Sequence, residues 1–215
     1  MNKPIAVLAG TPVDTQMGIA FLKQAGRTGV AFPISSDPVT QTQFQISSPS
    51  EKHAFVGGLL DRAKAQNCDS AFVYCNSLSS SVNFPALAKE KRLRIVTPLD
   101  VYREAAGRYT RLGVIAANAQ GLAGIERTLM QANPKLHLYG ACCLDAVLAV
   151  EDKEPPEEIV ERLHLTALVG WFTVCGCQAL VLGCTHFPYF KLALKKKTSL
   201  SLIDPADRMV ELLAQ

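Results

Sequence analysis

Short apolar runs alternate with longer amphipathic stretches along the whole chain. Eight runs are rich in β-branched and aliphatic residues, which is typical of buried strands. They are Ile5–Ala9, Val30–Ile34, Ala71–Tyr74, Ile95–Thr97, Gly113–Ala116, Leu136–Tyr139, Ala179–Leu182 and Leu200–Ile203. Between them, apolar residues recur at helical spacing in Gly18–Ala25, Glu51–Gln66, Val82–Lys91, Val101–Arg108, Leu122–Gln131, Glu157–Val174, Tyr189–Lys196 and Asp207–Ala214. This order predicts an α/β protein with mostly parallel sheets flanked by helices.

The pattern also repeats once along the chain, with corresponding segments 106 to 109 residues apart. The five pairs are Gly18-Ile19 with Gly124-Ile125, Gln24–Gly26 with Gln131–Asn133, Ser50-Glu51 with Pro156-Glu157, Ala71–Cys75 with Leu180–Cys184, and Val96–Asp100 with Ile203–Asp207. Two copies of one α/β unit, about 1–107 and 108–215, explain their common order.

The repeat predicts two similar lobes related by a pseudo-twofold axis. We expect the first lobe to span residues 1–97, completed by a C-terminal helix over 206–215, and the second to span 98–205. Open parallel sheets bind ligands outside the carboxyl ends of their strands, so the site is expected between the lobes.

Composition narrows the function classes. The 215 residues are 48% hydrophobic and 19% charged, as in a packed globular protein, and 22 basic against 19 acidic residues leave a net charge of +3 with no dense basic stripe. The chain has no apolar run of about 20 residues and no signal-peptide core. We therefore expect a cytosolic protein that binds neither nucleic acid nor membrane.

Two of the seven cysteines occupy equivalent positions in the repeat. Cys75 and Cys184 each follow an apolar strand and precede small polar residues. A thiol at such a turn lies near free backbone N–H groups and a helix N-terminus, which favour the thiolate. Two such thiols facing one ligand suit stereoinversion at an acidic C–H, with one removing a proton and the other returning one. Asn76, Ser77, Thr185 and backbone N–H groups would hold the developing negative charge.

Other interpretations of the cysteines remain open. Either thiol alone could be a buried core residue, and we interpret the other five in that way. A zinc site from Cys175, Cys177, Cys184 and His186 is disfavoured, because the strand Ala179–Leu182 separates the two pairs. We therefore expect no metal. A thiol-redox role for Cys75 and Cys184 is a further alternative.

The two cysteine motifs resemble those of the aspartate/glutamate racemase superfamily. The resemblance lies in Val73–Ser77 and in Val181–Pro188, where Gly-Cys-Thr-His followed by aromatic-Pro is similar to the glutamate racemase version. It implies a cofactor-independent isomerase with two α/β lobes and one catalytic cysteine from each. A role in supplying D-amino acids for peptidoglycan precursors rests on this resemblance alone.

Carried over by position, the resemblance implies that Cys75 acts on the D-enantiomer and Cys184 on the L-enantiomer. Asn76, Ser77, Thr185 and His186 would line the site, and His186 is either a proton partner for Cys184 or a structural histidine.

Three regions depart from the glutamate racemase pattern or match it weakly. Ala9–Asp14 replaces an Asp-Ser-Gly turn, where Thr11 or Asp14 could substitute, although Asp14 is also a natural N-cap for a helix over Gln16–Ala25. The polar segment Ser35–Ser50 lacks the Pro-Tyr-Gly stretch and is expected to be a loop. Glu151 stands at the position of an auxiliary glutamate, or is part of a solvated helix entry.

The sequence thus predicts a racemase for glutamate or, next, aspartate that forms a homodimer. Within the enzymes, the alternatives are a hydantoin racemase, a maleate isomerase or an arylmalonate decarboxylase. Outside them, the alternative is a non-catalytic carboxylate-binding protein.

Overall fold

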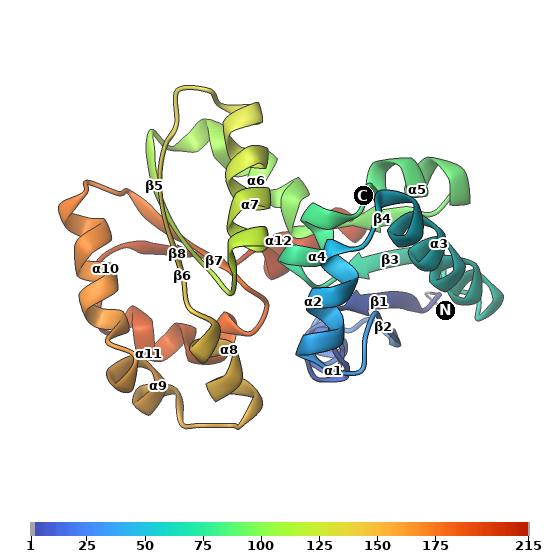
Figure 1. The fold of residues 1–215 in the computed structure, drawn as a ribbon, viewed down its shortest axis with the longest axis horizontal. Helices are drawn as coiled ribbons and strands as arrows, with labels where there is room; N and C mark the ends of the chain where they lie inside the picture. Colours follow the sequence, from blue (N-terminus) through green and yellow to red (C-terminus); the bar gives the residue numbers. More distant parts are fainter. Residues whose placement is uncertain (1–2, 215) are drawn as a thin grey trace. The chain divides into compact units, whose positions relative to one another are not determined.

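The computed structural model describes residues 3–214, which form two compact units (Figure 1). Unit 1 comprises the described residues up to Val101 together with those from Ala206 onward, and unit 2 comprises Tyr102–Pro205. Each unit contains one four-stranded parallel sheet with helices on its faces, as the alternation of apolar runs predicts.

Unit 1 is built on a sheet with the strand order β2-β1-β3-β4. Its elements are β1 (Ile5–Ala9), α1 (Pro12–Gln24), β2 (Gly29–Pro33), α2 (Pro38–Ile46), α3 (Pro49–Ala65), β3 (Ser70–Val73), α4 (Asn76–Ser81), α5 (Phe84–Lys91), β4 (Arg94–Val96), α6 (Pro98–Ala105), whose last residues belong to unit 2, and α12 (Pro205–Leu213). The central strands β1 and β3 are buried along their whole length, which explains why both are continuously apolar.

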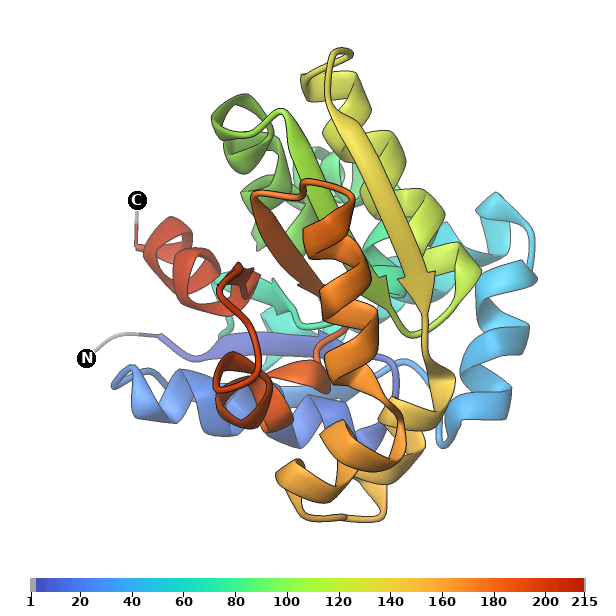
Figure 2. The same ribbon diagram turned by 90° about the vertical axis from the view of Figure 1, so that its left-hand side faces the viewer.

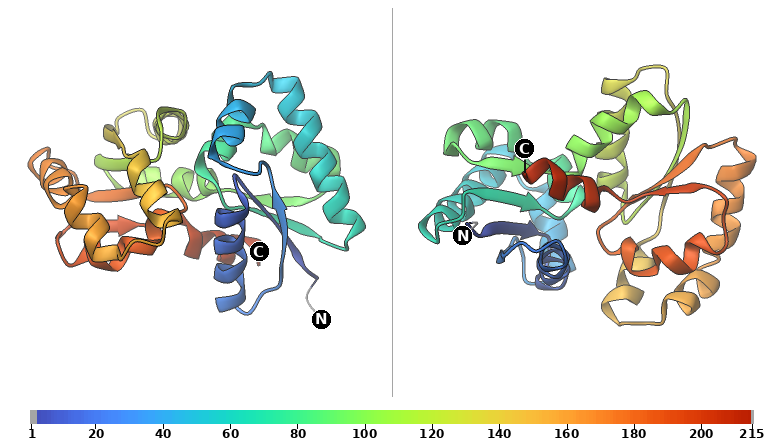
Figure 3. Two further views of the ribbon diagram at one scale, coloured as in Figure 1. Left: turned by 60° about the horizontal axis from the view of Figure 1, so that its bottom comes forward. Right: turned by 180° about the vertical axis from the view of Figure 1, so that it is seen from behind.

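The core of unit 1 combines this sheet with residues far away in sequence. Met209 and Leu213 of α12 join the same buried cluster as Val7 and Phe72 of the central strands. Figure 3 shows that the last helix of the chain follows β8 of unit 2, although it packs as part of unit 1. Because its apolar side chains complete this core, α12 stabilises unit 1 by burial.

Unit 2 repeats the architecture with the strand order β6-β5-β7-β8. Its elements are the 3-10 helix η1 (Ala106–Arg108), β5 (Arg111–Ala116), α7 (Ala119–Ala132), β6 (His137–Cys142), α8 (Leu144–Glu151), α9 (Pro156–Arg162), α10 (Leu165–Val174), β7 (Ala179–Gly183), the 3-10 helix η2 (Phe187–Phe190), α11 (Lys191–Lys195) and β8 (Ser201–Ile203). Figure 2 shows α10, in orange, lying over one face of this sheet. The strand orders correspond one to one, so the two units are similar lobes.

Several helices begin at capping residues that the sequence supplies. Ser48 accepts a hydrogen bond from the backbone N–H of Glu51, whose carboxylate accepts one from the N–H of Ser48, and this closes a capping box before α3. Asn83 and Asn118 cap α5 and α7 through their side-chain oxygens. Pro85 lies in the first turn of α5, where a backbone N–H would have no hydrogen-bond acceptor within the helix, so its absence in proline costs nothing.

Some sequence-based expectations are wrong in detail. Ser35–Ser50 is not a loop, because Asp37 caps the N-terminus of α2 inside it. Asp14 is not the N-cap of α1; Thr11 takes that position, and Asp14 lies three residues into the helix. The segment Glu157–Val174 is two helices, separated at His164, whose backbone adopts the left-handed conformation with φ of 50°. Helices α4 and α8 were not predicted.

None of the helices between residues 3 and 214 combines the length and apolar composition that a bilayer-spanning segment requires.

Candidate active site

Cys75 lies at the carboxyl edge of the unit 1 sheet. It follows β3 and is the N-cap residue of α4, with an extended backbone (φ −165°). Its carbonyl accepts hydrogen bonds from the backbone N–H of Ser79 (3.1 Å) and from the Ser79 hydroxyl (2.6 Å). Cys75, Asn76 and Ser77 are all buried, with 9% exposure or less. The thiol is therefore held on a rigid turn, and the two residues after it open the helix.

Two polar side chains contact the sulfur of Cys75. The side-chain amide Nε2 of Gln41 donates to Cys75 Sγ at 3.5 Å, and Ser77 Oγ lies 3.5 Å from the same atom. Ser77 is itself held by Gln45, whose Nε2 donates to Ser77 Oγ at 2.8 Å. Both glutamines come from α2, so these contacts depend on a helix that the sequence pattern did not predict.

The first strand-to-helix turn lies at the same edge of the sheet. Strands β1 and β3 are neighbours, with Leu8 paired to Val73, so Gly10 and Cys75 leave the sheet at the same edge. The Asp14 carboxylate accepts hydrogen bonds from the backbone N–H groups of Gly10 (3.0 Å) and Thr11 (2.6 Å) and from the Thr11 hydroxyl (3.1 Å). Thr11 and Asp14 are buried. The carboxylate thereby fixes the conformation of this turn.

Cys184 lies at the corresponding edge of unit 2. It follows β7, whose last residue Gly183 pairs with Ala116 of the central strand β5. Cys184 and the two residues after it, Thr185 and His186, are each 8% exposed or less. A 3-10 helix follows instead of a regular α-helix. The expectation of a helix N-terminus beside the thiol therefore does not apply to Cys184.

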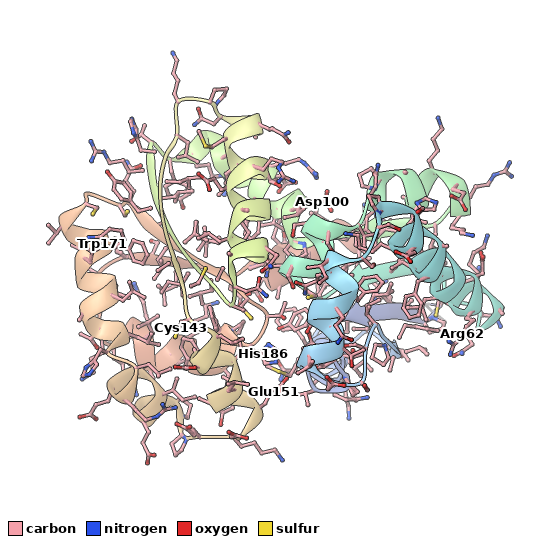
Figure 4. All side chains as sticks on the ribbon, in the orientation of Figure 1. Arg62, Asp100, Cys143, Glu151, Trp171 and His186 are labelled. Carbon is pink, nitrogen blue, oxygen red and sulfur yellow. The ribbon has the colours of Figure 1, made fainter. Side chains whose placement is uncertain are left out.

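An imidazole and a carboxylate stand behind the Cys184 thiol. His186 Nδ1 lies 3.6 Å from Cys184 Sγ, and His186 Nε2 lies 3.3 Å from Glu151 Oε1 at the end of α8 (Figure 4). A carboxylate hydrogen-bonded to one ring nitrogen fixes the ring orientation and stabilises a proton on the imidazole. This arrangement can take a proton from the thiol or return it.

The structure thus assembles the sequence-based candidates into two groups. Unit 1 brings together Thr11, Asp14, Cys75, Asn76 and Ser77, and unit 2 brings together Glu151, Cys184, Thr185 and His186. Gln41 and Gln45 of unit 1 were not among the residues predicted from the sequence. Their spacing of four residues after the helix-starting pair Asp37-Pro38 is the signal that could have identified a helical face.

Of the five other cysteines, Cys68 and Cys177 are buried as expected, whereas Cys142 is exposed and Cys143 and Cys175 are half-buried, so the core interpretation is wrong for these three. The two buried cysteines have environments that disfavour the thiolate. Burial, reinforced by the nearby carboxylate of Asp69, raises the pKa of the Cys68 thiol. Burial, with a smaller contribution from Cys175, also raises the pKa of the Cys177 thiol. A buried thiol of raised pKa is a poor proton acceptor, so neither resembles an acid/base group.

Residues 3–214 contain no group of three or more histidine, cysteine or acidic residues arranged to hold a metal ion. The zinc interpretation also fails on topology, because Cys175 and Cys177 precede β7 whereas Cys184 and His186 follow it. The five-residue strand carries the two pairs to opposite ends.

The known proteins that resemble this chain in sequence and in structure include glutamate and aspartate racemases. No family model matches the chain. A glutamate racemase from Gloeobacter violaceus is 29% identical over 208 residues, which cover 92% of this chain and 76% of the relative. Among solved structures, glutamate racemase from Francisella tularensis in complex with D-glutamate has a TM-score of 0.76 at 19% identity, covering 99% of this chain and 80% of that one. An aspartate racemase homologue from Pyrococcus horikoshii has a TM-score of 0.71 at 13% identity, and the match covers 98% of this chain and 99% of the homologue. These structural likenesses establish the fold.

Proposed function

We propose that this chain, which is similar to glutamate and aspartate racemases, is an amino-acid racemase, an isomerase that inverts Cα with two thiols and without a cofactor. One observation carries the proposal: Cys75 and Cys184 occupy matching places in two matching sheets. Each follows the third strand in the order of its sheet, β3 or β7, and each is contacted by the side chain two residues further on, at 3.5 Å for Ser77 and 3.6 Å for His186.

In the proposed reaction, one cysteine enters as thiolate and the other as thiol. The thiolate accepts the Cα proton of the bound amino acid, and the electron pair of the C–H bond remains on the substrate as a carbanion. The second thiol then donates its proton to the opposite face of Cα and becomes a thiolate. The product has the inverted configuration, and the two cysteines have exchanged protonation states.

We assign proton removal from the D-enantiomer to Cys75 and from the L-enantiomer to Cys184. His186, supported by Glu151, exchanges protons with Cys184. Asn76, Ser77, Thr185 and the backbone N–H groups of the two turns stabilise the negative charge that develops on the substrate carboxylate, because preorganised donors act most strongly on charge that appears in the transition state.

Glutamate is the proposed substrate, with aspartate second. Two findings support this order: the aligned relative from Gloeobacter is a glutamate racemase, and the solved structure of the Francisella enzyme contains D-glutamate. The Gly183–Pro188 motif of this chain is also similar to that of glutamate racemases.

Hydrogen exchange at Cα tests the proposal. The protein is incubated in heavy water with D- and L-glutamate and D- and L-aspartate in turn, and deuterium at Cα is measured by proton NMR. We expect incorporation with both enantiomers of glutamate, and a loss of about 100-fold or more in rate for Cys75→Ala and for Cys184→Ala, as removal of an acid/base group implies.

The matched control is Cys68→Ala, which removes another buried thiol and should exchange at the parent rate. Absence of exchange with every amino acid would instead favour a carboxylate-binding protein. Normal turnover by either Cys75→Ala or Cys184→Ala would refute the two-thiol mechanism.

A further inference from the structure

The two thiols are supported by equivalent relays of different chemistry. In unit 2 the relay runs from Glu151, on the helix after β6, to His186 and then to Cys184. In unit 1 it runs from Gln45, on the helix after β2, to Ser77 and then to Cys75. Strands β2 and β6 hold equivalent places in their sheets. The same architecture therefore presents an ionisable relay to one thiol and an uncharged relay to the other.

The uncharged relay has a defined hydrogen-bond direction. Gln45 Nε2 donates to Ser77 Oγ at 2.8 Å, so the Ser77 oxygen uses a lone pair for that bond and its hydroxyl proton can point to Cys75 Sγ at 3.5 Å. Gln45 is buried, and its Oε1 has no hydrogen-bond partner among the described residues. Burying an unsatisfied oxygen destabilises the fold, and a leucine of similar size at this position would avoid that cost. The hydrogen bond that the Gln45 amide donates to Ser77 is therefore what distinguishes glutamine from an apolar residue here.

Gln41 supplies a second donor to the same sulfur. Its Nε2 donates to Cys75 Sγ at 3.5 Å, and its amide lies directly over Gly10. A Cβ atom on residue 10 would stand 2.0 Å from Gln41 Nε2. Glycine at this turn thus leaves the space through which the amide reaches the thiol.

Helix α2 is itself fixed, so both amides are presented in a defined position. Lys52 of α3 is buried and donates through Nζ to the carbonyl oxygen of Gln45 at 3.0 Å, at the C-terminal end of α2 where a cation is favourable. The rings of Phe44 and Phe55 pack with centroids 5.5 Å apart. Asp37 caps the other end.

We propose that Gln41 and Gln45 are positioning residues that stabilise the thiolate of Cys75 with uncharged donors, Gln41 directly and Gln45 through Ser77. Hydrogen bonds to the charged form of an acid favour that form. The catalytic consequence rests on the proposed function, because only a racemase uses this thiolate as a base; the effect on the thiol itself does not.

Charged groups on the neighbouring elements define the background for a titration. Asp14 of α1 is bound to the turn after β1, Lys52 of α3 to the end of α2, and Asp37 to the start of α2. Substituting the two glutamines leaves these charges in place.

The test measures the titration of Cys75 in the full chain. Thiolate formation is followed by ultraviolet absorbance against pH, and the curve of the Cys75→Ser protein is subtracted from that of its parent to isolate this thiol. The test is made in the Gln41→Met and Gln45→Met backgrounds, which keep side-chain length and remove the amide. We expect the midpoint to rise by about one pH unit in each, a tenfold loss of thiolate at a pH below the midpoint.

Gln43→Met is the matched control, because it makes the same substitution at an exposed position of the same helix and should leave the midpoint unchanged. Should either methionine variant fold poorly, Gln41→Glu and Gln45→Glu keep the shape of the side chain. They should raise the midpoint further by placing a negative charge near the thiolate. Unchanged midpoints in folded variants at positions 41 and 45 overturn the proposal.

The exchange assay with glutamate separates this proposal from the proposed function. Raised midpoints with no Cα exchange in the parent protein would retain the relay and reject the racemase. Normal exchange with unchanged midpoints would retain the racemase and reject the relay.

Discussion

Replacing Gly183 by alanine tests how the residue before Cys184 is packed. A Cβ atom built there would lie 2.6 Å from Ile125 Cδ1 and 2.9 Å from the backbone carbonyl oxygen of Ile115. The isoleucine side chain can rotate away, but the carbonyl belongs to the central strand β5, which is hydrogen-bonded to β6 and β7. One strand must therefore move by several tenths of an ångström. Overpacking of this kind costs about 1 to 3 kcal/mol.

Thermal unfolding followed by circular dichroism measures this cost. For a chain of this length, about 2 kcal/mol corresponds to a fall in Tm of about 4 to 8 °C. Gly170→Ala is the matched control: Gly170 is exposed within α10, and its Cβ would meet no atom within 4 Å. Alanine there should stabilise the protein by about 0.5 to 1 kcal/mol, because glycine is the poorer helix former. A Gly183→Ala protein as stable as its parent would refute the packing argument.

Three further predictions follow from the described contacts. Asp14→Asn should lower the free energy of unfolding, measured in urea, by about 2 kcal/mol, because the amide nitrogen would face one of the two backbone N–H groups that now donate to the carboxylate. Unchanged stability would show that the carboxylate does not hold this turn. Hydrogen bonds from Ser36 and then Thr40 lower the pKa of Asp37 from 3.8 to about 2. The stability that the ionised carboxylate contributes is therefore present above about pH 4 and is lost as the pH falls toward 2. Asp37→Asn should flatten this part of the curve of stability against pH, and an unaltered curve would show that the cap does not contribute to stability. Glu151→Gln should reduce kcat/KM by about tenfold or more. The loss should be equal for both enantiomers, because racemisation has an equilibrium constant of one. Polarimetry started from each enantiomer measures both rates, and a variant as active as its parent would contradict a role for this carboxylate.

Much of the fold could be predicted because the strands are buried on both faces. Ile5–Ala9 and Ala179–Gly183 are continuously apolar, and this pattern is readable without knowing their partners. The eight strands among residues 3–214 lie within a few residues of the predicted ones. Helix α2 was missed because its exposed positions include the apolar residues Val39 and Ile46, while the polar Gln45 is buried, which reverses the usual polarity of a helical face.

The site could be predicted only where chemistry is local in sequence. Cys75 with Ser77, and Cys184 with His186, are two residues apart, so their contacts are visible in a motif. The contact of Gln41 with Cys75 spans 34 residues and depends on how α2 packs. For Asp14, the sequence indicated a place near the start of a helix but not its hydrogen-bond partners. Its carboxylate accepts hydrogen bonds from the turn that precedes the helix, as the N3 residue of a capping box does.

The isotope content of the first product shows whether two thiols act on one carbon. L-glutamate is converted in heavy water, and after a small fraction of turnover both enantiomers are analysed by mass spectrometry. We expect the D-glutamate formed to carry deuterium at Cα in nearly every molecule and the remaining L-glutamate to carry almost none, because one thiol removes the proton and the other, which has exchanged with solvent, supplies a deuteron. D-glutamate that retains the original hydrogen would show that a single group moves the proton, which is incompatible with a two-thiol mechanism.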